Sequence, residues 1–150
     1  MITLPYELTT LYTLLIGAVI TDLRSRRVPN ALNAVLALGG LGAQVMTLGL
    51  DGLWVSALGV GMALALLIVP FALYVYRGGD VKLCMGVGAW LGWEPTLWVV
   101  AYGVLIGGAL GLLQLGAARA GLWRVERGAP QTVPMALAFA LASLLVTQDL

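Results

Sequence analysis

Two aspartates are the side chains in this sequence best placed to do chemistry. Asp22 ends one apolar run, in the stretch TDLRSRRVPN, and Asp80 opens a later one, in RGGDVKL. An ionisable residue at the edge of a membrane-spanning run costs free energy, so it is a functional candidate whose partner has to be identified. We expect folding to bring these two aspartates together as partners.

Two carboxyl groups within a few ångströms of each other do not ionise together easily, so such a pair holds one proton between them. The ionised member acts as a base that activates water, and the protonated member acts as an acid that protonates a leaving amine. An anion is favoured at a helix N-terminus and disfavoured near a C-terminus. This argument predicts Asp80 as the base and Asp22 as the acid of an aspartic peptidase.

The elements that position the aspartates are expected to be membrane helices. Hydrophobic residues make up 61% of the 150 residues and charged residues only 10%, whereas a soluble domain has roughly 25% charged residues. A crossing needs about 20 mainly apolar residues, and a backbone in lipid must satisfy its own hydrogen bonds. The composition therefore predicts an all-α polytopic membrane protein, with residues 1–150 forming a single transmembrane domain.

Six apolar runs are separated by polar or Gly/Pro residues, and we interpret them as six transmembrane helices. They cover residues 6–22, 31–49, 53–76, 80–93, 96–116 and 133–147, with a solvated or interfacial connector over 117–132. The first run has no basic residue before it and three after it, the reverse of a cleavable signal peptide, so it is expected to be retained. The fourth run is short for a crossing and is counted because the charge pattern requires it.

The charges predict how these helices are oriented. Alternating the six runs across the membrane places all eight basic residues at one face: Arg24, Arg26, Arg27, Arg77, Lys82, Arg119, Arg124 and Arg127. Excess Lys and Arg marks the cytoplasmic side. Both termini are therefore expected on the extracytoplasmic side, and both aspartates at the cytoplasmic rim.

Residues near the aspartates have weaker signals. Gly78 and Gly79 let a peptide backbone approach the Asp80 carboxylate closely, or they form a plain flexible loop, and the sequence leaves both readings open. Asn30, after Pro29, is interpreted as the N-cap of the second helix in preference to a substrate contact. Lys82 is expected to reach toward lipid head groups. One cysteine and no histidine argue against a disulfide, zinc or a Ser-His triad, and neither a metal nor a cofactor is expected.

Together these motifs resemble a known family. Asp22, a basic run and Val28-Pro29-Asn30, followed about 50 residues later by Gly79-Asp80-Val81-Lys82-Leu83, are similar to the type IV prepilin peptidases, membrane aspartyl proteases of the GxGD type. The resemblance implies an enzyme of the bacterial inner membrane that removes the leader of a prepilin or pseudopilin at the cytoplasmic face. It implies Asp22 and Asp80 as the catalytic pair, with Gly78, Gly79, Pro29 and Asn30 shaping the site or binding substrate.

The resemblance also implies a subfamily. The small size is similar to that of the short members that serve Flp-type pili and tight-adherence (Tad) machinery. Larger relatives carry a segment with paired Cys-x-x-Cys motifs and also methylate the new N-terminus, so cleavage without methylation is expected here. One departure is that Arg77 stands where the family has its first motif glycine. Arg77 pairs with phospholipid, holds a carboxylate in its charged form, or only adds to the cytoplasmic positive charge, and the last interpretation is preferred.

Two other functions would use the same residues. A small proton-coupled transporter or channel keeps carboxylates as a relay, but such a relay usually lies toward the middle of the bilayer, whereas both acids here are expected at one rim. A non-catalytic scaffold would use the acids to cap helices or pair with arginines. The expected partners are a substrate helix and membrane lipid, with no nucleic acid, and the oligomeric state is open.

Overall fold

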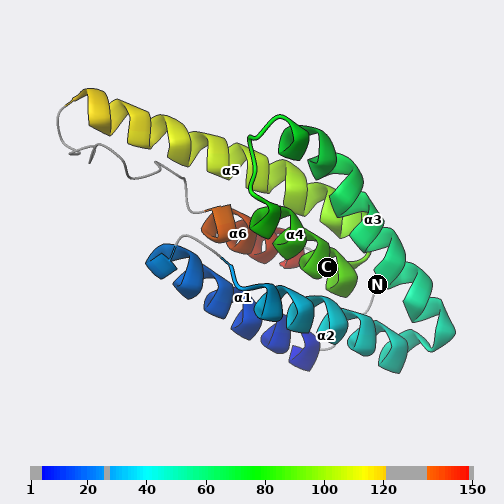
Figure 1. The fold of residues 1–150 in the computed structure, drawn as a ribbon. Helices are drawn as coiled ribbons and strands as arrows, with labels where there is room; N and C mark the ends of the chain where they lie inside the picture. Colours follow the sequence, from blue (N-terminus) through cyan, green and yellow to red (C-terminus); the bar gives the residue numbers. More distant parts are fainter. Residues whose placement is uncertain (1–4, 26–27, 121–134, 149–150) are drawn as a thin grey trace.

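The computed structural model describes residues 5–25, 28–120 and 135–148 (Figure 1). Within these residues the chain forms helices and no strand: α1 (Pro5–Ser25), α2 (Asn30–Leu48), α3 (Leu50–Ala72), α4 (Gly78–Leu91), α5 (Trp93–Arg119) and α6 (Met135–Thr147). The all-α prediction is confirmed for this part of the chain, and each of the six apolar runs corresponds to one helix.

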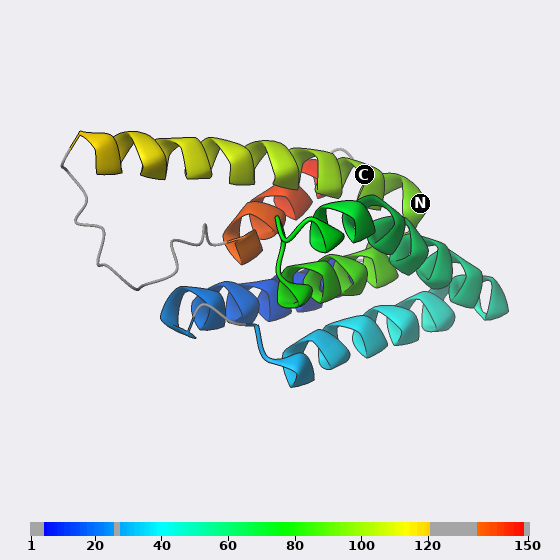
Figure 2. The same ribbon diagram turned by 45° about the horizontal axis from the view of Figure 1, so that its top comes forward.

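Helix α4 lies at the centre of the bundle, with the other helices around it (Figures 1 and 2). Ten of its 14 residues are buried. At 1.5 Å per residue the helix is about 21 Å long, less than the roughly 30 Å of a hydrocarbon layer. The apolar residues of α4 are therefore covered mainly by protein.

Three of the described helices, α2, α3 and α5, are long and apolar enough to cross a membrane, and α6 is a shorter apolar helix. Large apolar side chains on these three helices are exposed in the bundle, among them Leu38, Leu58 and Leu105, as expected for surfaces that face lipid. The crossing of all six helices and the location of the termini remain predictions.

A glycine contact sets the distance between α3 and α4. A Cβ built on Gly59 would lie 2.7 Å from the carbonyl carbon of Gly88, and a Cβ on Gly88 would lie 2.7 Å from the carbonyl carbon of Gly59. Because both neighbours are backbone atoms, the two helices approach this closely only when both positions lack a side chain.

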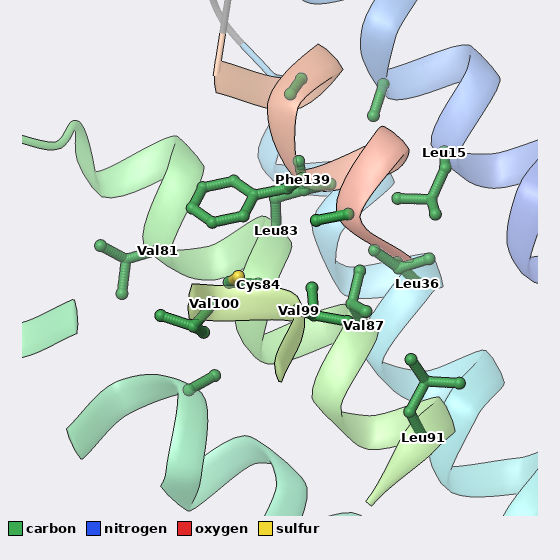
Figure 3. Packing of buried hydrophobic residues seen from close by; sticks show 14 of the residues in the cluster. Leu15, Leu36, Val81, Leu83, Cys84, Val87, Leu91, Val99, Val100 and Phe139 are labelled. Carbon is green, nitrogen blue, oxygen red and sulfur yellow. The ribbon is translucent and has the colours of Figure 1, made fainter. Parts of the chain in front are cut away.

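Two small residues of α5 receive large side chains of α6. Gly103 lies against the Phe139 ring, and a Cβ on Gly107 would lie 2.7 Å from a methyl carbon of Met135. Phe139 is fully buried and reaches toward Leu83 of α4 (Figure 3). These two glycines of α5 thus let α6 pack closely against α5 inside the bundle.

Helix α3 ends four residues before the end of the apolar run that predicted it. The N–H of Val75 donates to the carbonyl of Pro70 at 2.9 Å, and the N–H of Tyr74 donates to that of Phe71 at 3.0 Å, the two bonds of a Schellman motif. Tyr74 occupies the left-handed position of this motif, with φ at +58°. The turn redirects the chain into residues 75–77 and then α4.

Helix α5 continues to Arg119, so the expected connector over 117–132 begins with helical residues. The rest of that connector, including Glu126, lies outside the described residues, as do Val133 and Pro134.

Candidate active site

Asp22 lies in the last turns of α1 and is buried, with 8% of its surface exposed. Its Oδ2 accepts a hydrogen bond from the N–H of Ala136 at 3.3 Å. Ala136 is the second residue of α6, where backbone N–H groups have no partner inside the helix. The Asp22 side chain therefore caps the N-terminus of α6. It can do so because α1 and α6 run antiparallel, which places the end of α1 beside the start of α6.

Asp80 is the third residue of α4 and is also buried, with 6% of its surface exposed. Its Oδ2 accepts a hydrogen bond from the N–H of Arg77 at 3.2 Å. This bond folds the carboxylate back over the residue that precedes the helix, as in a capping box. The orientation of Asp80 is therefore set locally by the turn that enters α4.

The structure brings the two aspartates together. Their carboxylates lie close enough to interact electrostatically, although they come from helices far apart in the sequence. Each carboxylate lies at the N-terminus of a helix: that of Asp22 accepts a hydrogen bond from the start of α6, and that of Asp80 lies in the first turn of α4. The sequence argument placed Asp22 only at the C-terminus of α1, so it omitted the positive end of α6. Helix dipoles consequently do not decide which aspartate is the base.

The two glycines before Asp80 form the first turn of α4 and have no left-handed backbone angle. A Cβ on Gly79 would lie 3.9 Å from the backbone of Val28, and one on Gly78 would lie 3.7 Å from the Phe71 ring. Both distances are ordinary van der Waals contacts. Neither glycine is therefore required by the packing of the described residues, and neither belongs to a flexible loop.

Pro29 and Asn30 stand at the start of α2 and are exposed. The N-cap is Pro29, and no side chain caps this helix, so the interpretation of Asn30 as N-cap is wrong. Its Oδ1 instead accepts a hydrogen bond from Nζ of Lys82 at 3.0 Å. This bond joins the N-termini of α2 and α4 beside the aspartates, and it gives Lys82 a protein partner where a lipid head group was expected.

Arg77 is the N-cap of α4, with φ −86° and ψ 154°. These are extended backbone angles that any residue adopts, so arginine in place of the motif glycine introduces no backbone strain. Its charge lies within electrostatic range of the Asp80 carboxylate. The side chain is exposed.

Two residues near the acid pair were not singled out from the sequence. Asn33, one turn into α2, is buried, and its Nδ2 lies 3.5 Å from the carbonyl oxygen of Gly79. Tyr76 is also buried, its ring centroid lies 6.1 Å from that of Phe139, and it lies within electrostatic range of Asp80. A polar residue inside an apolar run was the available signal for Asn33.

No group of three or more potential metal ligands occurs among the residues that the structure describes. A bundle of apolar helices with two buried, neighbouring aspartates at one end defines a candidate membrane hydrolase. The chain matches the type IV leader peptidase family over residues 9–112, which is more than half of its length and includes both aspartates. It belongs to that family.

Membership makes this protein a peptidase of membranes and implies a prepilin as substrate. The match ends within α5, so the contact between Asp22 and α6 lies partly outside the matched region. Comparisons with curated proteins and with solved structures found no match.

Proposed function

We infer that this protein is an aspartic endopeptidase that removes the leader of Flp-type prepilins or pseudopilins at the cytoplasmic face of the bacterial inner membrane, without methylating the product. The observation that carries this proposal is the meeting of two buried aspartates, Asp22 and Asp80, within electrostatic range of each other. The family match supplies the substrate class.

In the proposed mechanism the two carboxyl groups share a water molecule through their Oδ1 atoms. In each aspartate the hydrogen bond to the backbone uses Oδ2, and among the described residues none is made to Oδ1. The ionised carboxyl removes a proton from water, whose oxygen attacks the scissile carbonyl carbon. The protonated carboxyl then gives its proton to the leaving amine as the carbon–nitrogen bond breaks.

The charges at this end of the bundle support a cytoplasmic location. Arg24, Arg77 and Lys82 are exposed near the acid pair, whereas Asp51 and Glu94 are exposed at the opposite end. Because positive residues mark the cytoplasmic side, the aspartates would face the leader before it is removed. The basic residues at 26, 27, 124 and 127 lie outside the described residues.

Cleavage without methylation is proposed from the cysteine content. The 150 residues contain one cysteine, Cys84, so this sequence has no paired Cys-x-x-Cys motifs. Cys84 is fully buried among apolar residues in α4, where we assign it a packing role.

The buried polar side chains favour peptidase chemistry over a proton-coupled transporter. Gln44 donates to the carbonyl of Trp90, Thr96 to that of Gly92 at 2.5 Å, and Ser143 to that of Phe139 at 2.7 Å. Each therefore already has a backbone partner. A relay through the bundle would need polar groups that continue from the acid pair, and these three do not supply them.

The proposal is tested with Asp22→Asn and Asp80→Asn, made separately and assayed in membranes with an Flp-type prepilin. Each variant should lose at least about 100-fold in cleavage rate, since acid–base catalysis contributes roughly 10²–10⁴-fold. Asp51→Asn, at the opposite end, is the matched control and should cleave normally. Mass spectrometry of the product should show an unmethylated N-terminus. Normal cleavage by either active-site variant, at equal protein level, removes that aspartate from the mechanism.

A further inference from the structure

Asn33 is a buried polar residue whose contacts in the fold do not account for its side-chain oxygen. Only 5% of its surface is exposed, and its Oδ1 has no hydrogen-bond partner among the described residues. Buried acceptors are nearly always paired, and leaving one unpaired destabilises a protein. An apolar side chain would avoid this cost in an apolar helix, so packing does not explain an asparagine at this position.

The one hydrogen bond that Asn33 makes places it beside the acid pair. Its Nδ2 lies 3.5 Å from the carbonyl oxygen of Gly79, the residue directly before Asp80. This distance is at the long limit for a hydrogen bond, so the bond holds the amide only weakly. The planar amide keeps Oδ1 close to Nδ2, and the unpaired acceptor consequently also lies near the backbone of the aspartate motif.

Resting on the proposed peptidase function, we propose that Asn33 binds the substrate main chain: its Oδ1 accepts the N–H of a substrate residue adjacent to the scissile bond. A helix must be unwound before a peptidase can cleave within it, and unwinding releases backbone N–H groups that need new partners in apolar surroundings. An acceptor beside the backbone of the aspartate motif suits an N–H that is released near the scissile bond.

The adjacent glycine is consistent with this arrangement. A Cβ on Gly79 would make only ordinary van der Waals contacts, at 3.9 Å from the backbone of Val28, so the missing side chain leaves room for about one methyl group beside the aspartate motif. In the proposal, the substrate main chain lies near this residue. The weak bond from Nδ2 to Gly79 uses the donor of the amide, so its oxygen remains the unpaired atom.

The test combines an enzyme variant with a change in the substrate. Asn33→Leu keeps the approximate volume and removes the acceptor, and a peptide series replaces one amide near the scissile bond by an ester, which removes one N–H. With the wild-type enzyme, the ester at a single position should lower kcat/KM about 10-fold or more. Asn33→Leu should lower it similarly on the amide peptide, and should cause no further loss on that ester.

Protein stability separates this role from a structural one. Asn33→Leu should unfold at the same temperature as the wild type or higher, because the unpaired acceptor is gone. Should it fail to fold, Asn33→Ser is measured in the same cycle. Equal kcat/KM for variant and wild type, or losses that multiply independently at every ester position, would overturn the inference. Absence of any cleavage by the wild type would instead overturn the proposed function.

Discussion

The contact between α3 and α4 gives a prediction whose size follows from the structure. In Gly59→Ala the added methyl carbon would lie 2.7 Å from the carbonyl carbon of Gly88, whereas two carbon atoms pack best at about 3.5–4.0 Å. The overlap is therefore roughly 0.8 Å or more. The Cβ position is fixed by the backbone of α3, and the atom that it meets belongs to the backbone of α4, so no side-chain rotation relieves the overlap. Overpacking costs about 1–3 kcal/mol, and we expect the upper end of that range.

Gly61→Ala is the matched control, because it makes the same chemical change two residues along the same helix. A Cβ on Gly61 would meet no atom within 4 Å, and alanine favours a helix over glycine by about 0.8–1.0 kcal/mol. Both variants gain this helix preference, so the overlap alone separates them. The expected difference of about 3 kcal/mol corresponds to a ratio of roughly 100-fold in the folding equilibrium.

The assay is equilibrium unfolding of the purified variants in detergent or lipid, combined with cleavage of a prepilin. Gly61→Ala should be at least as stable as the wild type and should cleave normally. Gly59→Ala should be less stable, and its remaining folded protein should cleave more slowly because a displaced α4 carries Asp80 with it. Equal stability of the two alanine variants would show that α3 and α4 do not meet at Gly59 and Gly88.

Two further predictions concern the turn and the glycine that precede Asp80. Tyr74→Gly should raise the unfolding temperature in a thermal melt, because a left-handed residue with a side chain costs about 1 kcal/mol and Tyr74 is 96% exposed; a lower temperature would mean that its ring contributes packing. Gly79→Ala should melt at the temperature of the wild type or above it, because its Cβ makes only ordinary contacts and alanine favours a helix over glycine, but it should show a raised KM because the methyl group hinders an approaching peptide. An unchanged KM would argue against substrate passing over Gly79.

The sequence was informative where the signal is local or chemical. Runs of apolar residues identified the six helices, and the cost of an acid at the edge of an apolar run singled out Asp22 and Asp80. Their proximity in the structure is consistent with the prediction that they are partners. The family resemblance is confirmed by the match over residues 9–112, while the catalytic roles of the two aspartates stay predictions.

Other features depend on which helices become neighbours, and the sequence does not encode this locally. The residues next to Asp22 in the sequence do not indicate that the start of α6 will donate a hydrogen bond to it. Asn30 has the residue type of an N-cap, yet tertiary contact with Lys82 uses its side chain instead. The end of α3 was missed because tyrosine is not a typical residue for the left-handed position at Tyr74, where glycine is usual.

The acid pair is divided between two parts of the bundle. Asp22 is carried by α1, which packs mainly on α6 and touches α4 little, whereas Asp80 belongs to α4, which is held firmly by α2 and α3. A sideways movement of α1 would therefore alter the spacing of the carboxyl groups while leaving most of the core intact. Any change in the distance between these two parts, including one caused by a substrate helix that inserts between them, would therefore change the rate of cleavage.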